Sequence, residues 1–113
     1  MMQNLTKKTK LDINIKICSD IFSQSLGLMF SKKQNRALIF KLDYEKIVPL
    51  HMMFVFYPID VLFLNKDKVV VDLKENFRPF AFYTPKEKSI YVVEIPQGSI
   101  KKLKAEVGDK IKF

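Results

Sequence analysis

Three side chains in apolar parts of the sequence could take part in binding or catalysis. His51 and Asp60 lie within the strongly apolar residues 48–64, and Glu94 interrupts a second apolar run at residues 90–95. His51 is the only histidine and the one side chain expected to titrate near neutral pH. A few polar groups converging in an apolar pocket are the usual form of a ligand site. We therefore take His51, Asp60 and Glu94 as candidate ligand-binding residues.

Each of these residues also has a structural interpretation, which the sequence alone favours. Asp60 follows Pro58 closely, so its carboxylate could accept backbone N–H groups at a bend, because burying a bare charge is costly. Glu94 could be an outward charge or half of an ion pair. His51 could be a core or rim residue.

Composition excludes several kinds of site. The 113 residues include three glycines, one cysteine and one histidine. The glycines are too far apart for a phosphate-binding loop or a dinucleotide fingerprint. One cysteine cannot form a disulfide within the chain, and one cysteine with one histidine excludes the usual zinc sites. We expect no cofactor and no metal, and we expect Cys18 to be a buried apolar residue.

The formal net charge of +8 is compatible with an anionic partner such as a nucleic acid, a membrane surface or an acidic ligand. Of the 20 basic residues, 18 are lysine, and only Arg36 and Arg78 are arginine. Lysine is a hydrated point charge, so such a surface favours nonspecific attraction over sequence readout. A solvated surface is the more typical interpretation. The densest groups are Lys7, Lys8 and Lys10, and then Lys101, Lys102 and Lys104.

The sequence carries no recognisable targeting or membrane-spanning segment. Residues 1–10 are polar and basic, without the apolar run of a secretion signal. The apolar residues 48–64 are interrupted by Pro49 and Pro58, which is unlike a spanning helix. Without a disulfide framework, the expected location is the cytoplasm.

Short strands with turns between them must position the candidate residues. Alternation at residues 11–17 and apolar runs at 36–42, 50–57, 60–64, 69–73, 90–95 and 111–113 predict strands, with an irregular edge strand at 77–83. Residues 65–68 predict the turn of a hairpin. Residues 19–30 predict a short helix, and residues 100–105 a helical turn. We expect an all-β fold, a compact single-domain barrel or sandwich of about seven short, mostly antiparallel strands with one short helix. The domain should span residues 11–113, after a polar basic segment at residues 1–10.

Several motifs in order resemble the DUF192 family, a set of small domains in bacteria and archaea. They are Gly27-Leu28-Met29, Ala37-Leu38-Ile39-Phe40, Leu50-His51-Met52, Pro58-Ile59-Asp60-Val61-Leu62-Phe63, Val92-Val93-Glu94-Ile95-Pro96-Gln97-Gly98 and Val107-Gly108-Asp109-Lys110-Ile111. The resemblance covers residues 11–113 and implies an all-β fold with no established activity. Many members carry a Trp-Met pair at His51-Met52, and the histidine form is similar to the archaeal branch. Many bacterial relatives begin with a secretion signal, so a periplasmic role is not carried over.

The sequence therefore predicts a non-enzymatic binding domain for a small ligand or a protein partner, at a pocket near His51, Asp60 and Glu94. One alternative is a nonspecific anion or nucleic-acid binder that uses the lysines, with steep salt dependence. Another is a hydrolase that uses His51 with a carboxylate. No Gly-x-Ser-x-Gly elbow marks a nucleophilic serine, which favours the binding domain over the enzyme.

Overall fold

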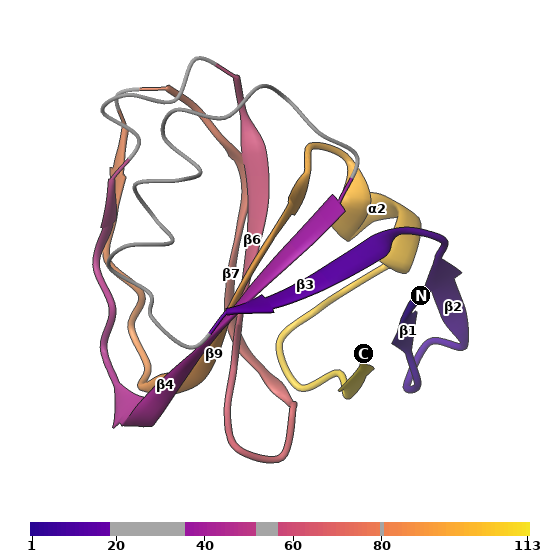
Figure 1. Ribbon diagram of the computed structural model, residues 1–113, viewed down its shortest axis with the longest axis horizontal. Helices are drawn as coiled ribbons and strands as arrows, with labels where there is room; N and C mark the ends of the chain where they lie inside the picture. Colours follow the sequence, from indigo (N-terminus) through magenta and orange to yellow (C-terminus); the bar gives the residue numbers. More distant parts are fainter. Residues whose placement is uncertain (19–35, 52–56, 80) are drawn as a thin grey trace.

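A five-stranded sheet runs through the middle of the molecule (Figure 1). The computed structural model describes residues 1–18, 36–51, 57–79 and 81–113. Every neighbouring pair in this sheet is antiparallel except the first, β3 with β4, and β9 is the central strand. In their order across the sheet, the strands are β3 (Asn14–Cys18), β4 (Arg36–Lys46), β9 (Ser89–Pro96), β6 (Ile59–Leu64) and β7 (Val70–Phe77).

The inner strands are apolar almost throughout because both faces of the sheet are buried. All six residues of β6 are buried. Side chains alternate between the two faces of a strand. Val61 and Phe63 accordingly belong to one core cluster, and Leu62 and Leu64 belong to another on the opposite face.

A small sheet and the helix α2 (Ser99–Leu103) cover one face (Figure 1). Residues 1–10, expected as a polar segment ahead of the domain, lie within this layer: Met2 has 0% of its surface exposed and belongs to the core. Alternation places Met2 in the core, although the polar residues Gln3 and Asn4 follow it in the sequence. The strands of the small sheet, in spatial order, are β10 (Ile111–Lys112), β1 (Met2–Asn4) and β2 (Thr9–Leu11).

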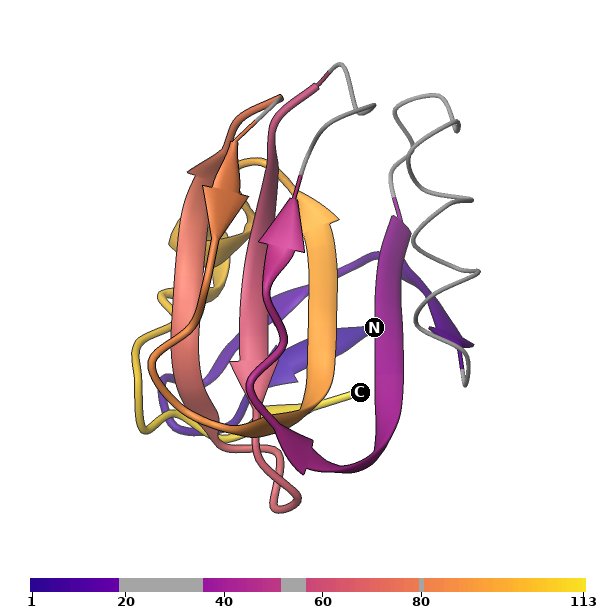
Figure 2. The same cartoon turned by 90° about the vertical axis from the view of Figure 1, so that its left-hand side faces the viewer.

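The opposite face is covered by a second layer that includes β5 (Leu50–His51) and β8 (Phe82–Tyr83), which pair with each other. In Figure 2 this layer lies in front of the five-stranded sheet, and β1 and β2 lie behind it. Leu50, Tyr57 and Tyr83 pack on the core cluster of this face. The buried members of that cluster are Leu38, Phe40, Ile59, Val61, Phe63, Phe77 and Val92.

The expected fold class is confirmed: the structure is all-β and sandwich-like, with one short helix in the described residues. The sheets of the described chain do not close into a barrel, and β3 and β7 are the edges of the larger one. The described residues form ten strands rather than about seven. The expected strands at 50–57 and 77–83 contain β5 and β8, and the additional strands are β1 and β2, which lie largely in the segment expected to be polar at residues 1–10. The expected helix at residues 19–30 and most of the expected strand at 50–57 lie outside the described residues.

The expected hairpin at residues 60–73 is confirmed as β6 paired with β7. Its turn contains no glycine, and Asn65 supplies the necessary contacts. The Asn65 carbonyl accepts the Lys68 N–H at 2.9 Å, and its Oδ1 accepts the N–H groups of Asp67 and Val69 at 2.9 and 3.0 Å. Lys68 takes the positive φ of 62° that glycine often provides.

Asp109 fastens the two ends of the chain together. Its buried carboxylate accepts hydrogen bonds from Asn4 Nδ2 at 2.9 Å, Lys7 Nζ at 2.7 Å and the Glu106 N–H at 3.0 Å. Burial by itself raises the pKa of the Asp109 carboxyl, but the hydrogen bonds from Lys7, Asn4 and Glu106 outweigh this effect and leave the pKa below its usual value. The ends of the chain are therefore joined by a charged contact as well as by β1 and β10.

Candidate functional site

Asp60 lies on β6, and the three hydrogen bonds that its carboxylate accepts all come from backbone N–H groups. The residue is only 1% exposed. Its Oδ1 accepts the Asn76 N–H at 2.9 Å, and its Oδ2 accepts the N–H groups of Gly98 and Ile100, both at 3.0 Å. The interpretation of Asp60 as an acceptor of backbone N–H groups is confirmed, with donors from β7 and from the start of α2.

The Asp60 carboxylate replaces a helix cap that the local sequence lacks. Gly98 precedes α2 with a positive φ of 91° and has no side chain to accept the first helical N–H groups. Those groups carry a partial positive charge, so a carboxylate beside them is favourable. Asp60 provides that carboxylate from another strand, across 40 residues of sequence from Ile100.

The same carboxylate coincides with an irregularity in β7. The register between β6 and β7 shifts between Ile59 and Val61, directly around Asp60. Asn76 lies in this bulge with a positive φ of 50° and gives its N–H to Asp60. The Asn76 Oδ1 then accepts a hydrogen bond from Gln97 Nε2 at 2.8 Å. The bulge is thereby joined to the turn that leads into α2.

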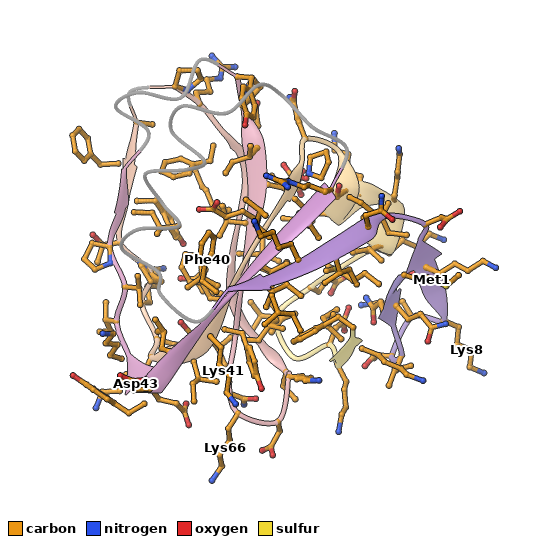
Figure 3. The ribbon with its side chains drawn as sticks, viewed as in Figure 1. Met1, Lys8, Phe40, Lys41, Asp43 and Lys66 are labelled. Carbon is orange, nitrogen blue, oxygen red and sulfur yellow. The ribbon has the colours of Figure 1, made fainter. Side chains whose placement is uncertain are left out.

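Glu94 lies on the central strand β9 in very different surroundings. Its partners in register are Leu38 on β4 and Val61 on β6, and paired residues share a face of the sheet. Both neighbours belong to the apolar core cluster on the side of β5 and β8. In Figure 3, Phe40 of the same cluster lies on this side of the sheet.

One oxygen of the Glu94 carboxyl is buried without a hydrogen bond from the described residues. The residue is 8% exposed, and its Oε2 has no partner in the part of the chain that the structure describes. Burial raises the pKa of this carboxyl to about 8, because the charged form loses its hydration. At neutral pH the group is therefore mostly protonated, and a neutral carboxyl both donates and accepts hydrogen bonds.

The five-stranded sheet separates two of the three residues expected to share a pocket. Asp60 is paired with Ile95, and Glu94 is paired with Val61, so the two carboxyls are one step apart in register. Because alternate residues face opposite sides, Asp60 faces α2 and Glu94 faces the β5–β8 layer. Asp60 and Glu94 therefore do not converge. His51 is on β5, in the layer over the Glu94 face, and its side chain lies outside the described residues.

Tyr83 is a polar residue of this layer that is not among the three candidate ligand-binding residues. Its hydroxyl donates to Asp72 Oδ1 at 2.8 Å, and its ring centroid lies 5.9 Å from that of Phe63. Burial, followed by the hydrogen bond to Asp72, raises the pKa of Tyr83 to about 12. The hydroxyl therefore stays protonated and serves as a hydrogen-bond donor. In the described residues, no three His, Cys, Asp or Glu side chains are grouped closely enough to hold a metal ion.

Replacing Asp60 with alanine should destabilise the domain strongly. The variant Asp60→Ala leaves three backbone N–H groups without their acceptor, and each unsatisfied buried group costs about 1–3 kcal/mol. We expect the free energy of unfolding in urea to fall by about 4 kcal/mol. Asp60→Asn should cost less because one amide oxygen remains. Asp67→Ala, at an exposed turn position, is the control and should change stability by less than about 0.5 kcal/mol. Wild-type stability in Asp60→Ala would show that the carboxylate is dispensable.

Replacing Glu94 with glutamine should change the pH dependence of stability. The pKa of the folded carboxyl is about 8, against an ordinary value of 4.5. Between these values the folded state keeps a proton that the unfolded state releases, so wild-type stability falls as pH rises. Glu94→Gln does not titrate, and its stability advantage should grow from near zero at about pH 4 to about 4 kcal/mol at about pH 8. Urea unfolding across this range measures the difference. Glu75→Gln, at an exposed position on β7, is the control. A constant difference between wild type and Glu94→Gln would contradict the raised pKa.

Two solved protein structures have the same arrangement of strands. A crystal structure of a candidate transcription regulator from Sinorhizobium meliloti 1021 superposes with a TM-score of 0.85 over 98% of this chain and 88% of that one, at 23% identity. A protein of unknown function from Novosphingobium aromaticivorans superposes with a TM-score of 0.78 over 89% of this chain and 75% of that one, at 22% identity. At these identities the likeness shows the fold alone.

Comparison of sequences identifies the family. A UPF0127 protein of Pyrococcus furiosus is 40% identical over 99% of this chain and 97% of its own length. A UPF0127 protein of Thermococcus sibiricus is 41% identical over 98% of this chain and 73% of its own length. The DUF192 family model, described as "Uncharacterized ACR, COG1430", matches residues 3–113. The chain therefore belongs to the DUF192 family, as the order of its motifs indicated.

Proposed function

We propose that this domain binds a small, mostly apolar molecule on the face of the five-stranded sheet that carries Glu94. The observation that carries the proposal is the Glu94 carboxyl, which is buried on the central strand and has an oxygen without a partner in the described residues. In this proposal the ligand supplies the missing hydrogen bond, and the apolar core cluster around Glu94 supplies the remaining contacts.

The energetic argument concerns what an unpaired carboxyl costs. Buried polar side chains in native proteins almost always have a hydrogen-bond partner. Leaving one unsatisfied costs about 1–3 kcal/mol, whereas a leucine among Leu38 and Val61 would cost nothing of this kind. Titratable groups with strongly shifted pKa values in apolar surroundings are common at binding sites, which supports a role outside folding.

The protonation state of Glu94 favours particular ligand chemistry. A neutral carboxyl forms two complementary hydrogen bonds with a planar group that both donates and accepts, such as an amide. An amine would require the carboxyl to ionise, and the net charge of +8 repels a cation that approaches the protein. We therefore place an amide-bearing, otherwise apolar molecule ahead of an amine.

The other two candidate residues have different places in this proposal. His51 stays a candidate for a second polar contact, because β5 lies in the layer over the Glu94 face. Asp60 supports the scaffold from the opposite face through its three backbone hydrogen bonds. A carboxyl that is protonated at neutral pH is a poor general base, so a hydrolase that pairs His51 with Glu94 gains no support from this geometry.

Thermal unfolding with small molecules tests the proposal. Amides, carboxylic acids and amines that carry the same aromatic or aliphatic tails should be compared at neutral pH. A bound molecule at about 100 times its dissociation constant adds about 2.7 kcal/mol of stability, a shift of several degrees for a domain of this size. We expect an amide to give such a shift.

Variants at Glu94 then show whether the bound molecule uses the carboxyl. Glu94→Leu removes the hydrogen bonds and should weaken binding at least about tenfold, because each lost hydrogen bond is worth about 1.5 kcal/mol. Glu94→Gln keeps a donor and an acceptor and should retain most of the affinity. Glu75→Gln, outside the proposed site, should bind like wild type. Equal binding by Glu94→Leu, or stabilisation by none of the molecules, would contradict the proposal and turn attention to a protein partner.

A further inference from the structure

Two groups of lysines that are far apart in the sequence belong to one part of the structure. The strand β2 packs against α2, where Thr9 Oγ1 donates a hydrogen bond to the Leu103 carbonyl. We call residues 1–11 and 97–113 the basic lobe; it contains β1, β2, α2 and β10. The lobe has eight lysines and two acidic residues, so its net charge is +6 out of +8 for the whole chain. Most of the excess positive charge is therefore gathered on one side of the molecule.

The two acidic residues of the lobe are both engaged by one lysine. Lys7 Nζ lies 2.7 Å from Asp109 Oδ2 and 3.6 Å from Glu106 Oε1. The remaining lysines of the lobe are all exposed, and none has an ion pair within the described residues. These unpaired lysines are Lys8, Lys10, Lys101, Lys102, Lys104, Lys110 and Lys112.

Several of these lysines share the outer face of the small sheet. Gln3 on β1 is paired with Lys10 on β2 and with Lys112 on β10, so the three side chains point to the same side. Met2, the neighbour of Gln3, points into the core. In Figure 3, Met1 and Lys8 project on the side of the molecule away from the five-stranded sheet.

Exposed aliphatic side chains lie among these charges. The Leu5 N–H donates to the Lys110 carbonyl at 2.8 Å, and the Lys110 N–H donates to Thr6 Oγ1 at 2.9 Å. These bonds hold the turn at residues 5–8 against Lys110, which follows the turn at residues 106–109. Leu5 is 46% exposed and Val107 is 63% exposed. Beside Leu5 lies a hollow of about 280 Å³, whose lining includes Gln3, Lys8 and Lys10.

We propose that the basic lobe binds the surface of a bilayer that contains anionic lipids. Lysines near such a surface are attracted to the phosphate headgroups, and exposed aliphatic side chains enter the boundary with the acyl chains. The hollow between Lys8 and Lys10 is lined by groups that can receive a lipid phosphate. Leu5 and Val107 supply the apolar contacts.

The chemistry of the lobe favours lipid over nucleic acid. Arginine forks and exposed aromatic rings are the usual means of contacting phosphates and bases in nucleic acids. Both arginines of the chain lie outside the lobe, and its one aromatic residue is Phe113. The Phe113 ring packs edge-on against Tyr91 at 5.4 Å, and Lys68 Nζ lies 4.1 Å from its centroid, so the ring is not presented for stacking.

Co-sedimentation of the full chain with lipid vesicles tests the proposal. We expect binding to vesicles of phosphatidylglycerol mixed with phosphatidylcholine, and little binding to phosphatidylcholine alone. Each lysine near an anionic surface raises binding about fivefold, so Lys10→Glu with Lys112→Glu should weaken it at least about twentyfold. The control reverses Lys41 and Lys88, which are exposed and outside the lobe and change the net charge equally. An equal effect of both pairs, or no binding to the anionic vesicles, would overturn the proposal.

A second pair of variants separates a lipid surface from a nucleic acid. Leu5→Ser with Val107→Ser should weaken vesicle binding several-fold and leave binding to a single-stranded oligonucleotide unchanged. Vesicle binding that this pair does not alter, or binding to the oligonucleotide that exceeds binding to the vesicles, would overturn the assignment to lipid. Thermal unfolding confirms that each variant folds. The Glu94→Leu variant should bind vesicles like wild type, so this result is independent of the ligand proposed at Glu94.

Discussion

The Asp60 carboxylate is the contact on which the arrangement around the five-stranded sheet depends. It joins β6 to the bulge of β7 and to the first turn of α2. All three bonds go to backbone N–H groups, so they fix the course of the chain rather than one rotamer. One face of the sheet is thereby closed by α2 and the small sheet. The opposite face is covered by the layer that contains β5 and β8, and it carries the buried Glu94.

Glu94 and Asp60 show how alternation gives two neighbouring carboxyls opposite roles. They are one step apart in register on adjacent strands, yet one has three donors and the other has an oxygen with none in the described residues. The Asp60 charge is stabilised by N–H groups near a helix start. None of the described residues gives the Glu94 charge such support, and protonation is the less costly state there. The Glu94 oxygen without a hydrogen-bond partner supports the ligand proposed on that face. The lysines of the basic lobe support a second, separate binding surface.

The sequence predicted those features that depend on local patterns. The hairpin around Asn65, the apolar strand β9 and the turn at Gly98 follow from runs of apolar residues and from turn residues. Asp60 and Glu94 lie on opposite faces of the sheet and not in one pocket. The sequence could not assign their faces, because the assignment requires the register of β6 against β9. The same limit applies to Met2, whose burial depends on core contacts with α2 and β10, about one hundred positions away in the sequence. The joining of the two lysine groups likewise follows from the packing of β2 on α2, which no local pattern encodes.

The most direct test of the account is a titration of the Glu94 carboxyl itself. Carbon-13 NMR of the side-chain carboxyl groups across pH reports each midpoint, and the spectrum of Glu94→Gln identifies the Glu94 signal by its loss. The account predicts a midpoint near pH 8 for Glu94, which would establish a buried, neutral carboxyl at physiological pH. A midpoint near the ordinary value of 4.5 would show that the charged form is hydrated or paired in solution. That result would contradict the unpaired carboxyl on which the proposed ligand site rests.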